Sequence, residues 1–120
     1  MIGKLAGLFR RPAALTATAA QQKVSNGAVL LDVRDLSEWR AGHAAQAHHV
    51  PLAELGGRLT ELPTDRPIVA VCRSGRRSSL ATRLLTRHGY SASNLTGGMH
   101  AWAAAGLPVV TQKNKPGQII

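Results

Sequence analysis

The chain contains a single cysteine, Cys72, among its 120 residues. One cysteine excludes an intramolecular disulfide and any redox mechanism that needs a pair of cysteines. If the thiol reacts, no second thiol in the chain can resolve the product, so the final acceptor must come from outside. A free reactive thiol suits a reducing compartment, and we therefore expect a cytoplasmic protein. A domain of this size needs neither a disulfide nor a metal to fold, and we expect no cofactor and no metal ion.

Acidic and aromatic residues are also scarce. The net formal charge is +9, Asp65 is the last acidic residue, and eight Lys or Arg residues follow it. Basic chains often bind nucleic acid, but aromatic residues make up only 3% of this one and it contains no nucleic-acid-binding motif. We therefore expect no nucleic acid as partner. The charge is better explained as a field that attracts a small anion or an acidic partner.

Long apolar runs are absent, and no stretch approaches the roughly 20 apolar residues that a membrane span requires. Residues 1–12 are short, basic and partly amphipathic, with too few apolar positions for the core of a signal peptide. Residues 111–120 are mostly polar, although the two isoleucines at 119–120 could dock on the domain. These patterns predict an N-terminal extension over residues 1–14, one domain over 15–110 and a C-terminal tail over 111–120.

Strand-like and helix-like segments alternate along the chain. Short strand-like segments are predicted at 29–33, 48–51, 68–71 and 92–95, the last at an edge. Apolar residues at 3.6-residue spacing, together with capping residues, predict helices at 17–25, 35–40, 52–62, 78–88 and 99–105. The alternation is typical of an α/β fold with a parallel sheet and helices on both faces. Ligands bind such sheets at the carboxyl ends of the strands. Asp32 and Cys72 each follow or end a strand, so we expect them at one rim.

Cys72 joins the strand at 68–71 to the helix for which Ser78 is the predicted N-cap. A thiol there faces a helix N-terminus and free loop amides, which favour the thiolate. Gly75 lets the loop turn its amides inward. Three arginines lie within five residues of Cys72. A buried, inert cysteine is the plain alternative, but such a residue would not need arginines around it, and the pattern favours a nucleophile.

Four sequence motifs occur in order and at consistent spacing: 31–39 (LDVRDLSEW), 42–52 (GH through VPL), 72–78 (CRSGRRS) and 97–109 (GGMHAW through GLPV). Together they resemble the rhodanese homology domain family over about residues 15–110. The resemblance implies a single α/β domain with a five-stranded parallel sheet. It also implies a thiosulfate sulfurtransferase-like enzyme that moves sulfane sulfur through a persulfide on a cysteine.

The resemblance assigns roles to individual residues. Cys72 would be the catalytic nucleophile, and the substrate-binding loop would comprise Arg73, Ser74, Gly75, Arg76 and Arg77. Within it, Arg73 and Arg76 could attract a small anionic donor such as thiosulfate, while Arg77 would shape the loop. Asp32, Arg34 and His43 would be supporting residues. The implied acceptor is an external thiol or cyanide.

The chain departs from the family pattern at three places. Residues 44–47 (AAQA) lack the glycine that commonly follows Gly-His, and Glu38 and Ser74 stand where the relatives that use thiosulfate best have basic residues. Two other functions therefore remain as alternatives. One is a noncatalytic sulfur-carrier or binding module. The other is a cysteine-based phosphatase or arsenate reductase, which is less favoured because Ser78 occupies the position where those loops have arginine.

The remaining polar and aromatic residues have simpler explanations. His43, His48 and His49 are expected to be packing and rim residues and not metal ligands. Asp32 is expected to cap or pair with a cation, and Arg83 and Arg87 to lie on a solvated helix face. Trp39 and Trp102 are expected in the core.

Overall fold

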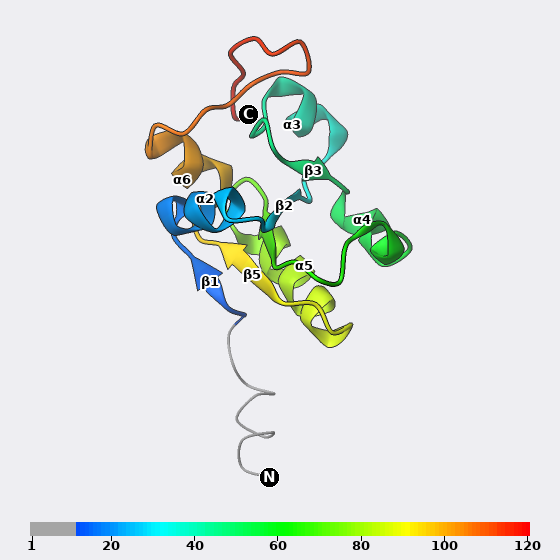
Figure 1. Cartoon of the computed structure of the whole chain (residues 1–120). Coiled ribbons are helices and arrows are strands. Elements are labelled where there is room, and N and C mark those ends of the chain that lie inside the picture. The colour runs from blue at the N-terminus through cyan, green and yellow to red at the C-terminus, as the bar shows by residue number, and fades with distance from the viewer. Residues whose placement is uncertain (1–11) are drawn as a thin grey trace.

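Helices and strands alternate along the computed structural model, which describes residues 12–120 (Figure 1). Its elements are β1 (Ala14–Leu15), α2 (Ala17–Ser25), β2 (Val29–Asp32), α3 (Leu36–Ala41), β3 (His48–His49), α4 (Leu52–Leu55), η1 (Leu59–Glu61), β4 (Ile68–Val71), α5 (Arg76–Arg87), β5 (Ala92–Leu95) and α6 (Gly98–Ala104). The strands form one five-stranded parallel sheet in the order β1-β5-β4-β2-β3. The predicted fold class is confirmed.

The sheet register brings the two rim positions together. β2 and β4 are adjacent, and Asp32 pairs in register with Val71, the residue before Cys72. The Val33 amide also donates to the Val71 carbonyl at 3.0 Å. Asp32 and Cys72 therefore lie side by side at the carboxyl ends of neighbouring strands, as the sequence predicts.

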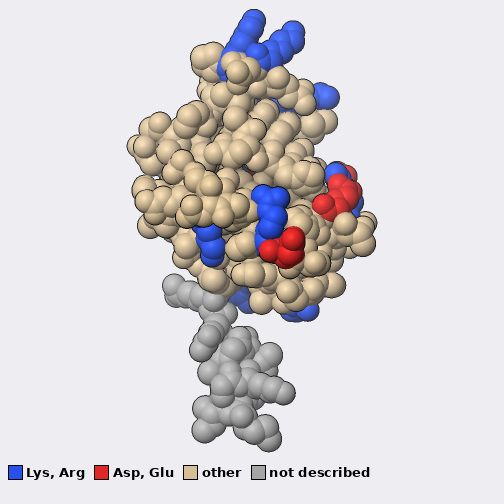
Figure 2. Space-filling view, viewed as in Figure 1, with Lys and Arg blue, Asp and Glu red and all other residues tan. Residues whose placement is uncertain are grey.

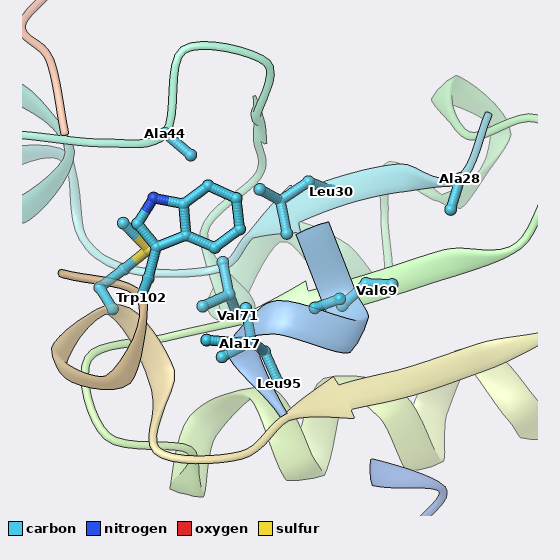
Figure 3. Close-up of a cluster of buried hydrophobic side chains, with 10 residues drawn as sticks. Ala17, Ala28, Leu30, Ala44, Val69, Val71, Leu95 and Trp102 are labelled. Atoms are coloured by element: carbon cyan, nitrogen blue, oxygen red, sulfur yellow. The ribbon is translucent and has the colours of Figure 1, made fainter. Parts of the chain in front are cut away.

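Two apolar cores form, one on each face of the sheet. The first packs α2 and α6 on the sheet around Trp102, together with Leu30, Val69, Val71 and Leu95 (Figure 3). The second packs α4 and α5 through Leu55, Ala81 and Leu85. Four consecutive buried residues make up β4, because both faces of this central strand are covered. The Trp102 indole N–H is satisfied by the Pro108 carbonyl at 2.9 Å.

The apolar spacing of residues 52–62 does not form one helix. The chain makes α4, leaves the helix at Gly56 and Gly57, and then forms the single 3-10 turn η1. Glycine disfavours helix by about 1 kcal/mol per residue relative to alanine, so two in succession outweigh the apolar spacing. The leucines Leu55 and Leu62 are still buried.

β5 is not an edge strand. β1 pairs outside it, with Ala14 opposite Asn94 and Leu15 opposite Leu95. A strand of two residues shows no sequence period, which is why the pattern alone missed it. β5 instead lies between β1 and β4, so Asn94 is held in the sheet beside the Cys72 loop.

The segment after α6 folds back onto the domain. Val110 bridges both His43 and Pro116, and the Gln118 amide donates to the Ala41 carbonyl at 2.8 Å. Ile119 packs against the first core, so this part of the predicted tail docks. At the other end, the part of the predicted extension that covers residues 1–11 lies outside the described residues. No helix over residues 12–120 is long and apolar enough to cross a membrane.

Candidate functional site

Cys72 sits at the carboxyl end of β4, where the chain turns through a short loop into α5. Its side chain is almost fully covered, with 1% of the residue exposed. α5 begins at Arg76, two residues earlier than predicted, and Gly75 is its N-cap with φ +113°. Only glycine adopts that backbone conformation readily. Ser78 is therefore not the cap but a buried residue of the first turn.

Hydrogen-bond donors converge on the Cys72 sulfur. The Gly75 amide donates to Sγ at 3.1 Å and the Ser78 hydroxyl lies 3.3 Å from it. Burial raises the pKa of the Cys72 thiol. The Ser78 hydroxyl and the amides of Ser78, Gly75 and Ser74 together outweigh burial, so the net pKa lies below the usual value. The sequence predicts this direction from the loop amides and the helix start, but not the contribution of the Ser78 side chain.

Asn94 of β5 completes the polar side of the loop. Its Nδ2 donates to the Gly75 carbonyl at 3.1 Å, and its Oδ1 accepts from the Ser78 hydroxyl at 2.5 Å. The carboxamide thus joins the two residues that face the sulfur. Sequence reasoning did not identify Asn94, because it is far from Cys72 in the chain and its edge placement was wrong.

The amino end of α6 donates hydrogen bonds to the backbone of the Cys72 loop. The Met99 amide donates to the Cys72 carbonyl at 2.8 Å, and the His100 amide donates to the Arg73 carbonyl at 3.2 Å. Gly98, at φ +60°, lies so close to this backbone that a Cβ would overlap the carbonyl groups of Cys72 and Arg73. Gly98, the first residue of α6, therefore allows the cysteine loop to pack closely on this helix.

The three loop arginines have different surroundings. Arg77 makes a bidentate pair with Glu38 of α3, at 2.6 and 2.9 Å. This pair raises the pKa of Arg77 and, against the effect of burial, lowers the pKa of Glu38. Arg73 Nε donates to the Ile120 carbonyl at 2.8 Å. Arg76 is exposed and makes no ion pair with any residue from 12 to 120.

Asp32 and Arg34 form a fully buried ion pair behind the loop. Arg34 Nη2 lies 2.7 Å from Asp32 Oδ2 and also donates to the Gly42 carbonyl at 2.7 Å. Asp32 additionally accepts from the Arg34 backbone amide at 3.1 Å. The expectation that Asp32 pairs with a cation is confirmed. Within residues 12–120 neither residue makes a hydrogen bond to the Cys72 sulfur, whose partners are Gly75 and Ser78. Asp32 and Arg34 can therefore affect the loop only by holding the ends of the neighbouring strands in place.

Two of the three histidines considered as a cluster, His43 and His49, stack on Trp39, whereas His48 lies 4.0 Å from Glu61. The Trp39 ring stacks on His43 at 3.6 Å between centroids and on His49 at 4.8 Å. His43 Nδ1 contacts the Trp39 carbonyl at 2.7 Å, and its backbone pairs with Val110. Trp39 is only half-buried, so its predicted place in the core is wrong. Among the described residues, no three His, Cys, Asp or Glu side chains gather in a way that could hold a metal ion.

A separate cavity of about 330 Å³ lies at the amino end of the sheet. Val29, His48, Glu61 and Arg66 are among the residues that line it. Every predicted site residue is outside this cavity. The groups that can do chemistry are instead gathered around the Cys72 loop, at the opposite end of the strands.

The chain resembles known proteins over most of its described length. The sequence pattern of the Rhodanese-like domain family matches residues 16–105. A sulfurtransferase of Allochromatium vinosum is 41% identical over 68% of this chain and 78% of its own length. A putative sulfur carrier protein of Bacillus subtilis is 37% identical over 70% of this chain, but the match spans only 47% of that protein.

A solved structure shows the same arrangement of elements. The rhodanese-related protein of Thermoplasma volcanium superposes with a TM-score of 0.78 and 27% identity. The superposition covers 83% of this chain and 99% of that one. Nearly the whole of that protein therefore corresponds to the part of this chain that contains the sheet and the cysteine loop.

Proposed function

Because this chain belongs to the rhodanese-like domain family, we propose that it transfers sulfane sulfur through a persulfide formed on Cys72. One observation carries the proposal: the Cys72 sulfur faces the Gly75 amide and the Ser78 hydroxyl at 3.1 and 3.3 Å. These donors stabilise negative charge on the Cys72 sulfur, which is a thiolate before loading and again after unloading. We assign the activity to the domain predicted over residues 15–110.

In the loading step the Cys72 thiolate attacks the outer sulfur of an anionic donor such as thiosulfate. The new bond joins Sγ to that sulfur, the sulfur–sulfur bond of the donor breaks, and sulfite leaves with the bonding electron pair. The persulfide keeps the single negative charge of the thiolate, and the loop amides can hold it without a proton transfer. In the unloading step a thiolate or cyanide attacks the outer sulfur, and Cys72 leaves as thiolate.

The donor's charge is a task for Arg73 and Arg76. Arg76 is exposed and unpaired among residues 12–120, and Arg73 keeps its terminal nitrogens for a ligand while Nε bonds Ile120. A guanidinium can hold a sulfonate through two hydrogen bonds. Arg77 is already occupied by Glu38, which supports a structural role for it.

A sulfur carrier is the second candidate, and the name of the Bacillus subtilis relative favours it. In that case the persulfide would be held and handed to one partner, with little turnover on small molecules. Phosphate chemistry is less suited to this loop. Phosphatase-type loops place arginine where this chain has the buried Ser78, whose hydroxyl is bonded inward to Asn94.

Intact-mass spectrometry tests the proposal. After incubation with thiosulfate and removal of excess reagent, we expect each chain to gain the mass of one sulfur atom. Cyanide should remove that sulfur and release thiocyanate. The Cys72→Ser variant should gain nothing, because the hydroxyl is hardly ionised at neutral pH. A wild-type mass that stays unchanged would contradict the proposal, and loading without catalytic turnover would favour the carrier.

A further inference from the structure

The outward face of α5 carries a stripe of like charge with an apolar side chain within it. Arg76, Leu80, Arg83 and Arg87 follow one another at intervals of four, three and four residues. At 3.6 residues per turn these positions fall on one side of the helix. The opposite side, made of Ser78, Ala81, Thr82 and Leu85, is the buried one. We call these four outward residues the α5 stripe.

Leu80 is the most exposed large apolar residue of the described chain, at 58%. Single exposed leucines are common on protein surfaces, but this one stands between arginines on both sides along the helix. An apolar side chain within a charged stripe is the composition of a small binding surface, where one buried anchor is surrounded by polar contacts.

The arginines of the stripe are not neutralised by the protein itself. Over residues 12–120, the ion pairs use Asp32, Glu38, Glu54 and Glu61, and none of these carboxylates pairs with Arg76, Arg83 or Arg87. Acidic side chains are also few on the face drawn in Figure 2, where they form two small groups that each adjoin basic side chains. The α5 stripe therefore keeps its positive field for a partner.

The stripe starts at the reactive loop. Arg76 is the first residue of α5, and the preceding residue, Gly75, donates its amide to the Cys72 sulfur. From there the stripe extends along the helix for about 16 Å, at 1.5 Å per residue. A segment bound along it would have one end beside Cys72, within reach for a transfer of sulfur.

We propose that the α5 stripe docks an acidic segment of a protein that carries the acceptor thiol, with an apolar side chain of that segment covering Leu80. The inference rests on the proposed function, because the docked thiolate attacks the outer sulfur of the Cys72 persulfide. The partner leaves as the persulfide, and Cys72 is released as thiolate. The surface is small and charged, which suits a rapid, transient encounter.

Nucleic acid fits the stripe less well. A phosphate backbone would engage the arginines, but it would place polar groups against Leu80. The stripe also lacks the aromatic side chains on which single-stranded bases stack. An acidic peptide with an apolar residue matches both the charges and the leucine.

The test uses two short synthetic thiol peptides as acceptors. One is rich in Glu and Asp and contains a leucine, and the other has Gln and Asn in place of the acids. The full chain is first loaded with thiosulfate, and the rate of sulfur transfer to each peptide is followed by mass spectrometry. We expect the acidic peptide to react several-fold faster at low salt, with the advantage shrinking at about 0.15 M, where the Debye length is about 8 Å.

Variants of the stripe locate the effect. Arg83→Glu combined with Arg87→Glu should reduce the rate of sulfur transfer to the acidic peptide to the rate measured with the neutral one. Leu80→Ser should reduce the rate of transfer to both peptides, by a factor that does not depend on salt. At about 0.15 M salt, where the field is screened, transfer to cyanide should be unchanged in these variants. The matched control, Lys23→Glu combined with Arg66→Glu, makes the same change in net charge away from the stripe and should keep the preference for the acidic peptide.

Three results would overturn the docking proposal. The first is equal rates with the two peptides, and the second is an equal loss in the Lys23/Arg66 control, which would mean a diffuse field. The third is a single-stranded oligonucleotide that binds the wild-type chain at about 0.15 M salt and not the Arg83/Arg87 variant. Binding of a fluorescent acidic peptide with serine in place of cysteine measures docking without chemistry. If that peptide binds but Cys72 never loads, the proposed function fails and the docking surface stands.

Discussion

The Ser78 hydroxyl is placed between two acceptors and has one proton to share. Its oxygen lies 2.5 Å from Asn94 Oδ1 and 3.3 Å from Cys72 Sγ. The orientation of Asn94 is fixed on its other side, where Nδ2 donates to the Gly75 carbonyl. When Cys72 loses its proton, the hydroxyl gains a charged acceptor, and a hydrogen bond to a charged group is the stronger one. Ser78 is thus positioned to respond to the charge state of the sulfur.

Replacing Ser78 by alanine should raise the pKa of Cys72. The variant loses the side-chain hydrogen bond that lowers this pKa in the wild type, while burial still raises it. The rate of alkylation by iodoacetamide at neutral pH should fall several-fold, and its midpoint should move to higher pH. Ser79→Ala is the matched control, since the side-chain hydrogen bond to the sulfur within residues 12–120 comes from Ser78 and not from Ser79. An unchanged midpoint in Ser78→Ala would mean that the loop amides alone set the acidity.

Sulfur loading by the wild type should increase with pH, with a midpoint below that of an ordinary cysteine. The reason is that the thiolate is the nucleophile and the pKa of Cys72 is lowered.

The lowered pKa of Cys72 also contributes to stability. The contribution is complete above the pKa of the unfolded chain and is lost as the pH falls through the pKa of the folded one. Denaturant unfolding across this window should show the contribution in the wild type and its loss in Cys72→Ser.

Substitution of Arg73 or Arg76 by alanine should raise the KM for thiosulfate several-fold, by the order of one charge-assisted hydrogen bond. Arg83→Ala and Arg87→Ala should have small effects that disappear as salt is added, because these residues lie further along α5 and act only through the field. Steady-state kinetics at two salt concentrations separates contact from field. Equal losses in all four variants would show that no individual arginine binds the donor.

Gly98→Ala should destabilise the fold and misplace the cysteine loop. The added Cβ would overlap the carbonyls of Cys72 and Arg73, and the backbone is left-handed at φ +60°. Gly106→Ala is the control, because Gly106 has a similar φ of +77° but nothing within 4 Å of its Cβ position. Left-handed strain alone costs about 1–2 kcal/mol, and overpacking adds about 1–3 kcal/mol. Gly98→Ala should therefore unfold at lower denaturant than Gly106→Ala and alkylate at an altered rate.

Asp32→Ala should be among the most destabilising single substitutions at the rim. It leaves the Arg34 guanidinium buried without its counter-charge, and breaking a buried pair in this way costs about 3–5 kcal/mol. Asp65→Ala removes a carboxylate of the same length from the surface and should change the free energy of unfolding little. Similar unfolding midpoints for the two variants would contradict a structural role for the pair.

The sequence predicts those parts of the fold that depend on neighbouring residues. The helix at Ala17–Ser25 and the strands at Ile68–Val71 and Ala92–Leu95 have the predicted bounds, because apolar spacing and capping residues such as Thr16 define them locally. The two-residue strand β1 was missed, since it exists only through its pairing with β5. The single helix predicted at 52–62 is wrong because the cost of two successive glycines exceeds what the apolar spacing contributes.

The site was partly predictable for the same reason. Cys72, its loop and the buried pair of Asp32 with a cation follow from local sequence. The contacts that complete the loop come from distant segments: Asn94 from β5, the amides of Met99 and His100 from α6, and the Ile120 carbonyl at Arg73. No pattern near Cys72 points to any of them. The contact of Ser78 with the sulfur was not predicted either, because it depends on α5 beginning after Gly75, which puts Ser78 inside the first turn.

The near-complete burial of Cys72 has a consequence for how an acceptor would distinguish the persulfide form of the protein from the unloaded form. With 1% of the residue exposed, the bare thiolate offers little surface to an acceptor as large as a protein. A sulfur atom added to it would stand one bond of about 2 Å beyond Sγ. A partner would then contact the outer sulfur of the persulfide and not Sγ of Cys72. A protein acceptor would therefore react with the persulfide form and leave the unloaded form alone, because only the persulfide presents a sulfur atom that such an acceptor can reach.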